Sequence, residues 1–571
     1  MALRNVIRAG VLIAAVAGAY PALANGVSGD YLAGRQASFT GDFKAAAKYY
    51  GRAILFDPKK PELLERALLA NISLGEIEKA AGLADKLAAE GQASQLAQMT
   101  QVARDAKAEN FAAVLKAIEE ERGLGPLADG LAKAWSQLGT GDMSAALVAF
   151  DEVGKVQGLG PFASYHKALA LASVGDFESA EAIFADENPG GMGMTRRGVM
   201  SRVEILSQLD RNTEALALLD TAFGADLDPG LDRMRAALEA GETLPFTHVN
   251  SARDGLAEVF FTLGSALASE NNGDLTLVYS RLAEYLRPDH VDAILLSAEL
   301  LDGMEQYDLA IETYARVPRD DMAFHAAEMG RAEALRAEGN LEGAAEVLKA
   351  LSESHPELPV VHSAYADLMR QMERFDEAIT GYTKALDGFS EIGERQWFLY
   401  YARGICNERA DHWDAAEADF RKALELSPEQ PNVLNYLGYS LVEKKEKLDE
   451  ALDMIERAVA AQPNSGYIVD SLGWVLYRLG RYEEAVSPME RAAELMPIDP
   501  IVNDHLGDVY WSVGRKMEAQ FMWKRALSFV DWEDASEEAN PERIKRKIEV
   551  GLDKVLAEEG APPLRVADDP N

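Results

Sequence analysis

One period in the sequence constrains the fold of this chain more than any other feature. In the stretch 471–497, apolar residues recur at the spacing of one helix face: Leu472, Leu476 and Leu479. A turn at Gly480 separates this predicted helix from a second apolar stripe, which Pro497 ends. A pair of helices this short cannot bury its apolar faces alone, so it needs neighbouring pairs to pack against.

The same unit recurs in phase on both sides of this stretch. Gly473 lies on the first predicted helix, and Gly507 follows it by 34 residues. Gly438 precedes Gly473 by 35 residues, and Gly404 precedes Gly438 by 34. The residues of a second helix follow Gly404 in register: Ala416, Phe420, Ala423 and Pro428. Because small residues let backbones approach closely, we expect Gly473 to lie where two helices cross.

These units resemble the tetratricopeptide-repeat family, whose pattern W-x2-L-G-x2-Y…A-x3-F…P recurs about every 34 residues. The resemblance implies an all-α fold, an α-solenoid superhelix of about a dozen helix–turn–helix repeats. Earlier anchors continue the period toward the N-terminus, at Gly34, Leu68, Val102, Ala134, Ala168 and Val203. Such a chain grows by adding repeats rather than by enlarging one core.

The longest break in the period lies between Val203 and Gly264, which are 61 residues apart. The extra residues predict a helix at 231–240 and a loop at 241–251. The glycine-rich segment 188–197 is predicted to be a flexible connector between helices. We therefore predict five segments: a signal peptide at 1–24, an N-terminal array at 25–228, an insertion or inter-array connector at 229–255, a C-terminal array at 256–531, and a capping helix with a disordered acidic tail at 532–571. The alternative is one continuous superhelix with an elaborated repeat.

Residues 1–24 are predicted to be a secretory signal peptide. Two arginines precede a short apolar run and an A-x-A cleavage site that ends at Ala24, so the mature chain is predicted to start at Asn25. The single cysteine of the chain is Cys406, so the acylated cysteine of a bacterial lipoprotein is missing. We expect an exported, periplasmic protein without an integral membrane segment.

The charge and the motifs of the chain narrow the function. The sequence has 57 basic and 94 acidic residues, a formal net charge of −37, which disfavours binding to nucleic acid and to anionic membrane surfaces. It contains no nucleophile elbow, phosphate-binding loop or H-E-x-x-H motif, and its eight histidines are scattered. We therefore predict no catalytic residue, no metal site and no cofactor, and hence a protein that is not an enzyme.

The resemblance implies that the first helices of the repeats line a concave groove in which a protein or peptide lies. Counting from the anchors selects candidate groove residues in the last four repeats: Tyr401, Asn435, Tyr439, Tyr467, Asp470, Trp474, Tyr477, Arg478, Asp504, Asp508 and Trp511. Aromatic residues and arginine are common anchors of protein-binding surfaces. The alternative is that neighbouring repeats bury some of these aromatic side chains.

The charges of these candidates predict the chemistry of the partner. Carboxylates at groove positions, such as Asp470, Asp504 and Asp508, repel the carboxylate terminus that some modules of this family bind. They suit an apolar segment that carries Lys or Arg. A carboxylate-clamp function is therefore not expected.

The leading hypothesis is a non-enzymatic periplasmic scaffold or adaptor that binds protein or peptide in the groove. The C-terminal run is also similar, less specifically, to envelope tetratricopeptide adaptors of carboxy-terminal processing proteases, although those carry a lipid anchor and this chain lacks the cysteine. A structural part of an envelope export or polysaccharide-secretion complex is the alternative. An unrecognised hydrolase is the third hypothesis.

Overall fold

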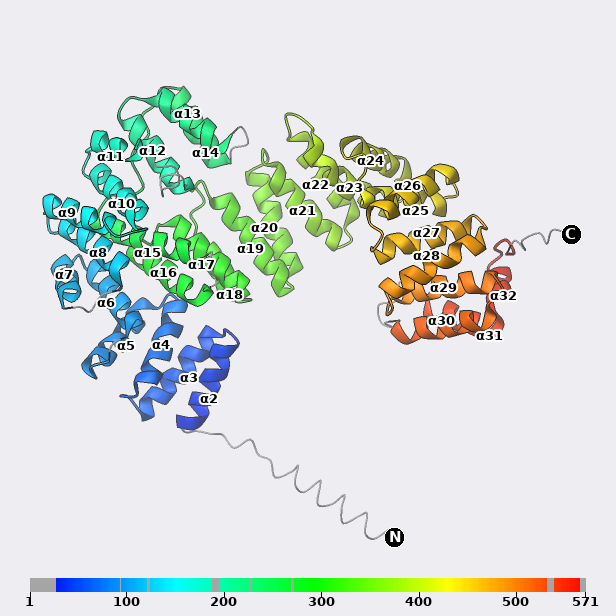
Figure 1. Cartoon of the computed structure of the whole chain (residues 1–571), viewed down its shortest axis with the longest axis horizontal. Coiled ribbons are helices and arrows are strands. Elements are labelled where there is room, and N and C mark those ends of the chain that lie inside the picture. The colour runs from blue at the N-terminus through cyan, green and yellow to red at the C-terminus, as the bar shows by residue number, and fades with distance from the viewer. Residues whose placement is uncertain are drawn as a thin grey trace, which may run out of the picture. The chain divides into compact units, whose positions relative to one another are not determined.

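A computed structural model describes residues 27–92, 94–120, 124–186, 195–224, 228–268, 272–530 and 539–564 (Figure 1). Over these ranges the chain is built from helices and contains no strand, which confirms the all-α prediction. The predicted signal peptide lies outside the described residues. The chain divides into two compact units, Met1–Val347 and Leu348–Asn571, called here unit 1 and unit 2.

Unit 1 holds helix pairs in chain order. They are α2 (Val27–Phe39), α3 (Phe43–Phe56), α4 (Pro61–Ser73), α5 (Ile77–Ala89), α6 (Gln95–Lys107), α7 (Phe111–Glu119), α8 (Pro126–Gly139), α9 (Met143–Gly154), α10 (Gly160–Ser173), α11 (Phe177–Phe184), α12 (Arg196–Gln208), α13 (Asn212–Phe223), α14 (Pro229–Glu239), α15 (Ala252–Ala268), α16 (Gly273–Leu286), α17 (Val291–Gly303), α18 (Tyr307–Tyr314) and α19 (Phe324–Glu338). The boundary between the units falls inside α20 (Leu341–Ser354).

Unit 2 continues the series of pairs. Its helices are α21 (Pro359–Gln371), α22 (Phe375–Asp387), the short 3-10 helix η2 (Glu394–Gln396), α23 (Trp397–Arg409), α24 (Trp413–Leu426), α25 (Pro431–Glu443), α26 (Leu448–Ala461), α27 (Gly466–Arg478), α28 (Tyr482–Leu495), α29 (Pro500–Ser512), α30 (Lys516–Phe529), α31 (Pro541–Val550) and α32 (Leu552–Glu558). None of the helices described in either unit is both long enough and apolar enough to span a membrane.

A Gly-Asp dipeptide makes the turn inside several repeats. Gly141 and Gly175 have φ values of 89° and 86°, a left-handed conformation that ends the first helix at little cost for glycine. The aspartate that follows caps the second helix: the Asp142 carboxylate accepts the backbone N–H of Ala145 at 2.9 Å. The dipeptide therefore stops one helix and starts the next.

The anchor glycines lie where the two helices of a repeat cross, as predicted. A Cβ atom added to Gly507 would lie 2.4 Å from the Trp523 ring, and one added to Gly473 would lie 2.2 Å from the Met489 sulfur. Gly404 lies equally close to a residue of the second helix, Phe420. Each of these three anchors faces the residue sixteen positions later, and Gly438 faces Ile455, seventeen positions later, so the period of the packing follows the period of the sequence.

Unit 1 folds back on itself. Helix α15 packs on α6, α8 and α10, and α16 packs on α4 and α6, so this later pair lies against the first helices of the early repeats (Figure 1). Gly255 makes the approach possible, because a Cβ atom there would lie 2.1 Å from the Trp135 ring. The residues that line a groove in an open array are here part of the largest hydrophobic core of the unit.

Because of this fold-back, the two compact units do not divide at the predicted connector, residues 229–255. The predicted helix in the long interval is α14, and 241–251 is a loop, but both lie inside unit 1. The units divide at Val347 instead, because α15 and α16 join the core of the repeats that precede them. The sequence period contains no signal for a contact between repeats that are far apart in the chain.

Candidate functional site

An open groove crosses the first helices of unit 2. It has a volume of 620 Å³, and its walls come from α23, α25, α27, α29 and the turn before α29. Four of the candidate groove residues line it: Asn435, Tyr439, Tyr467 and Asp470. Tyr467 is 49% exposed and donates a hydrogen bond from its hydroxyl to Asn432 Oδ1 at 2.7 Å, which holds the ring at the rim.

Two acceptors of the groove lack a donor. Asn435 and Asp470 are 8% and 7% exposed, and within the described part of the chain neither Oδ1 atom receives a hydrogen bond. The two residues occupy the equivalent position on α25 and α27, three residues before the anchors Gly438 and Gly473. A buried acceptor without a donor costs about 1–3 kcal/mol, so both positions favour a donor from outside the chain.

The aromatic residues beside the groove form a stack rather than a free wall. The Trp474 ring lies between His505, with centroids 3.8 Å apart, and Tyr477, with centroids 4.8 Å apart. The Trp474 indole N–H donates to Glu443 at 3.1 Å. Tyr477 is 8% exposed. Neighbouring repeats therefore bury Tyr477 and hold Trp474, as the alternative interpretation of the aromatics predicts.

The histidine in this stack is charged more readily than an ordinary histidine. His505 Nδ1 lies 3.0 Å from Asp470 Oδ2, and because a carboxylate only accepts, Nδ1 is the donor. Burial opposes the charge on the imidazole, but the carboxylates of Asp470, Asp504 and Asp508 outweigh it and raise the pKa of His505.

Asp504 and Asp508 do not face the open groove. They are 2% and 1% exposed, and the fully buried Lys547 ammonium lies 2.7 Å from an oxygen of each. Trp523 also donates to Asp508, at 2.8 Å. Burial raises the pKa of Asp504. Because α31 brings Lys547 between them, these carboxylates bind the chain itself and are not available to the lysine of a partner.

The C-terminal helices α31 and α32 also cover the end of the last repeat. The Trp511 indole N–H donates to Asp553 of α32 at 2.8 Å, and Gly551, between α31 and α32, lies against the Trp511 ring. The predicted capping helix is therefore present as two short helices that Gly551 separates. The linker residues 531–538 and the tail residues 565–571 lie outside the described residues.

Two further candidates lie beside the groove. Tyr401 packs on Phe420 and Tyr436, with ring centroids 6.1 and 6.0 Å apart, and burial raises its pKa to about 12. Arg478 is exposed and pairs with Glu443 at 3.4 Å. Four of the eleven candidates thus line the groove. The other seven pack between repeats, lie under the C-terminal helices α31 and α32, or lie beside the groove.

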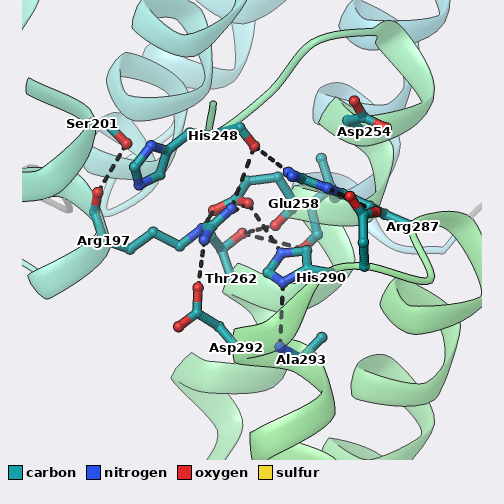
Figure 2. Close-up of polar contacts among 12 residues, drawn as sticks. Arg197, Ser201, His248, Asp254, Glu258, Thr262, Arg287, His290, Asp292 and Ala293 are labelled. Carbon is teal, nitrogen blue, oxygen red and sulfur yellow. Dashed lines mark hydrogen bonds and ion pairs between the residues drawn. The ribbon is translucent and has the colours of Figure 1, made fainter. Parts of the chain in front are cut away.

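A second cavity, of 560 Å³, lies in unit 1 and has no counterpart in the sequence predictions. Its polar floor is shown in Figure 2, where Arg197 reaches between Glu258 and Asp292. The Arg197 Nε atom lies 2.9 Å from both carboxylate oxygens of Glu258. Arg196 and Arg197 belong to the first turn of α12, which corrects the part of the connector prediction that covers these two residues; residues 187–194 lie outside the described ranges.

Glu258 is the centre of this cluster. Tyr165 donates to it at 2.8 Å, and His290 Nε2 lies 3.3 Å away. Burial alone would raise the pKa of Glu258, but the Arg197 guanidinium and the His290 hydrogen bond hold that pKa well below its usual range. Arg197 and Glu258 are 61 residues apart in the sequence, and no motif or period of the sequence links them.

The cluster contains acids, a histidine and a tyrosine, but each of these side chains already forms a hydrogen bond or an ion pair within the chain. His290 accepts the Ala293 backbone N–H on Nδ1, and burial together with Arg197 lowers its pKa, so it is a neutral donor to Glu258. No group of three or more potential metal ligands occurs among the described residues. These contacts fasten α10, α12, α15 and α17 to one another.

Residues 295–359, 366–431 and 437–500 match the sequence pattern of the tetratricopeptide repeat. A TPR repeat-containing protein of Pseudomonas aeruginosa is 26% identical over 181 residues, which are 31% of this chain and 30% of that protein. The tetratricopeptide repeat protein 13 of Homo sapiens is 27% identical over 176 residues, 30% of this chain and 20% of that protein. The chain therefore spans less than a third of the length of these two curated relatives.

Two solved structures align with the chain at low similarity. The Cut9–Hcn1 hetero-tetramer of the APC/C aligns over 91% of this chain and 95% of its own, with 15% identity and a TM-score of 0.36. The TPR protein YrrB aligns over 32% of this chain and 93% of its own, with 24% identity and a TM-score of 0.27.

Proposed function

The chain is a tetratricopeptide-repeat protein, and on that premise we propose that it is a non-enzymatic, exported scaffold that binds a polypeptide segment in the groove of unit 2. One observation carries the proposal: the buried acceptors Asn435 Oδ1 and Asp470 Oδ1 line an open groove and have no donor in the described part of the chain. Repeat arrays use their concave surfaces for binding. A polypeptide supplies hydrogen-bond donors along its whole length.

The partner segment is one that carries apolar side chains together with Lys or Arg. The lining of the groove includes four carboxylates, Glu408, Glu443, Asp470 and Asp499. It includes three basic side chains, Arg409, Lys444 and the imidazole of His505. The excess of carboxylates favours a cationic donor. Tyr439, Tyr467 and Ile501 supply the apolar contact area beside them.

Binding is tested with the mature full-length chain, used as bait in envelope extract of its native host. The double variant Asn435→Ala/Tyr467→Ala is expected to lose the polypeptide that co-purifies with the parent chain by about tenfold or more, because it removes one acceptor and one exposed ring. Phe521→Ala is the matched control, because Phe521 is 63% exposed on α30, outside the groove. Equal recovery on the double variant and on the parent chain would rule out the groove as the binding site.

The identity of the captured polypeptide separates the two roles proposed for such a scaffold. An adaptor for a carboxy-terminal processing protease is expected to recover the protease and its substrate together. A part of an export or polysaccharide-secretion complex is expected to recover pore or synthase subunits. If the polypeptide that depends on the groove belongs to neither class, the protein is a scaffold but serves a different pathway.

Export is proposed from the predicted signal peptide at 1–24. N-terminal sequencing of the protein from a periplasmic extract is expected to start at Asn25. A mature chain that keeps Arg4 and Arg8 would contradict this proposal.

A further inference from the structure

The cavity in unit 1 carries an inference that is independent of the groove. Its volume of 560 Å³ is within the range of about 300–1,000 Å³ that is usual for small-molecule sites. Helices α12, α15, α17 and α19 and the segment 241–251 form its walls, all within unit 1. We propose that this cavity binds a small, mostly apolar molecule that carries no negative charge.

The first argument is that the arginines of the cavity are already paired. Arg197 is held by Glu258 and Asp292, and Arg196 lies 2.6 Å from Asp228. Arg287 donates to the backbone carbonyl of His248 at 2.6 Å, to that of Thr247 at 3.3 Å and to Asp289 at 3.4 Å, as the right side of Figure 2 shows in part. An anionic ligand would have to break one of these contacts.

The acids and histidines of the cavity are paired in the same way. Glu204 accepts from the Thr247 backbone N–H at 2.8 Å and from His248 at 2.9 Å. Asp321 accepts the Ala323 backbone N–H at 2.8 Å, and His325 Nδ1 donates to the Met322 carbonyl at 3.1 Å. Among the described residues, however, Asp321 is paired with a backbone N–H alone and not with a basic side chain, so the pairing disfavours an anionic ligand rather than a cationic one.

The second argument is the surface that remains. Five large apolar side chains line the cavity and are each partly exposed: Met200, Phe261, Val291, Leu295 and Met322. Covering them with an apolar ligand removes their surface from water, which is favourable. The two methionines can adjust to the shape of different ligands.

The two arguments together select the charge of the ligand. An anionic group that enters this cavity is removed from water without gaining a counter-ion, because the arginines are already paired, and that desolvation is costly. A neutral apolar group meets no such cost. The ion pairs hold the walls in place before the ligand arrives, so little ordering is needed on binding.

The test uses two probes of one skeleton with the mature full-length chain: 3-phenyl-1-propanol and 3-phenylpropionate. Isothermal titration calorimetry is expected to show saturable binding of one equivalent of the alcohol. The carboxylate probe is expected to bind at least about tenfold more weakly, since its desolvation is uncompensated. The proposal is overturned if the alcohol shows no saturable binding up to its solubility limit, or if the carboxylate binds as tightly.

Variants locate the binding. Leu295→Trp and Ala326→Trp each fill the cavity from a different helix, α17 or α19, and are expected to weaken alcohol binding at least about tenfold. Leu55→Trp places the same indole on a side chain that is 81% exposed on α3 and is expected to leave binding unchanged. Circular dichroism shows whether each variant folds. If one of the two cavity variants does not fold, the binding measured with the other one is the test. Undiminished binding by a folded cavity variant would place the alcohol elsewhere.

Discussion

At the scale of single residues, the histidines of the two units respond to pH in opposite directions. In unit 2, the carboxylates around His505 overcome its burial and raise its pKa above the ordinary value. In unit 1, burial lowers the pKa of His166 to about 4, and its ring accepts the Trp135 indole N–H at 3.2 Å. One ring is therefore favoured in its charged form and the other in its neutral form.

Protonated His505 is expected to stabilise unit 2 at low and neutral pH. Because its folded pKa is raised, this contribution is complete below about pH 6.5, the unfolded value, and is lost as the pH rises through the folded pKa. The thermal midpoint of the parent chain should therefore fall more than that of His505→Gln between about pH 6 and pH 9. Parallel curves for the two proteins would contradict the assignment.

His166 is expected to destabilise unit 1 in acid. Its folded pKa is depressed, so its contribution is present above about pH 6.5 and is lost as the pH falls below that value toward about 4. The substitution His166→Gln should flatten the loss of thermal midpoint over this interval. A loss that is identical in the parent chain and the variant would assign the acid sensitivity to other groups.

Trp474 tests whether a candidate groove residue serves binding or packing. Because its ring is stacked between Tyr477 and His505, Trp474→Ala is expected to cost about 2–4 kcal/mol of unfolding free energy, near the range for aromatic truncations in a core. Chemical denaturation measures this cost, with Phe521→Ala as the control of an exposed ring. A change below about 0.5 kcal/mol would mean that the stack contributes nothing.

The helix scale is where the sequence predicted most. Anchors such as Gly473 and Gly507 each mark a contact within one repeat, and the structure has those contacts. The period predicts which residues face the partner helix because local packing repeats with it. Side chains that contact a distant helix, such as Asp508 and Lys547, carry no such period.

The cap shows what the period could not predict. Asp504 and Asp508 occupy groove positions by register, but α31 lies over them. A local signal existed: the last repeat is the one with two acids at these positions, and the basic run RIKRK of α31 follows it. The fold class could thus be predicted from the sequence, whereas the open part of the groove depended on where the last helix docks.

Lys547→Met is expected to detach or destabilise α31. It leaves the carboxylates of Asp504 and Asp508 buried without a cation, which costs about 3–5 kcal/mol. Hydrogen exchange of the α31 amides measures the loss of protection. The triple variant Lys547→Met/Asp504→Asn/Asp508→Asn removes the charges together and should recover much of the stability; if it is no more stable than the single variant, the ion pair is not the cause.

At the scale of the whole molecule, the two units use their first helices differently. Unit 1 buries them under α15 and α16, whereas unit 2 leaves part of its groove open. The sequence period is the same in both units, so this difference comes from long-range contacts that Gly255 and Trp135 permit. The open groove of unit 2 is therefore where the first helices of the described repeats stay accessible.

Gly255→Ala is expected to destabilise unit 1 by about 1–3 kcal/mol or more, because the added carbon would overlap the Trp135 ring. The double variant Gly255→Ala/Trp135→Leu makes room for the methyl group. The double variant should lose less unfolding free energy than the sum of the losses in the two single variants. Denaturation of the parent chain, the two single variants and the double variant measures this difference. If the two losses simply add, the close approach of Gly255 to the Trp135 ring is not the reason that Gly255→Ala is destabilising.

The return of α15 and α16 to the early repeats also determines the order in which unit 1 is completed. Arg281 donates to the backbone carbonyl of Ser73 at 3.2 Å, and Lys107 donates to that of Leu286 at 3.2 Å, across 208 and 179 residues of chain. Contacts this far apart in sequence are slow to form. During synthesis, the apolar inner faces of α4, α6 and α8 therefore stay uncovered until the chain has grown past residue 286. A nascent chain stopped before that point has a long window in which a chaperone can hold those faces, and in which aggregation competes with folding.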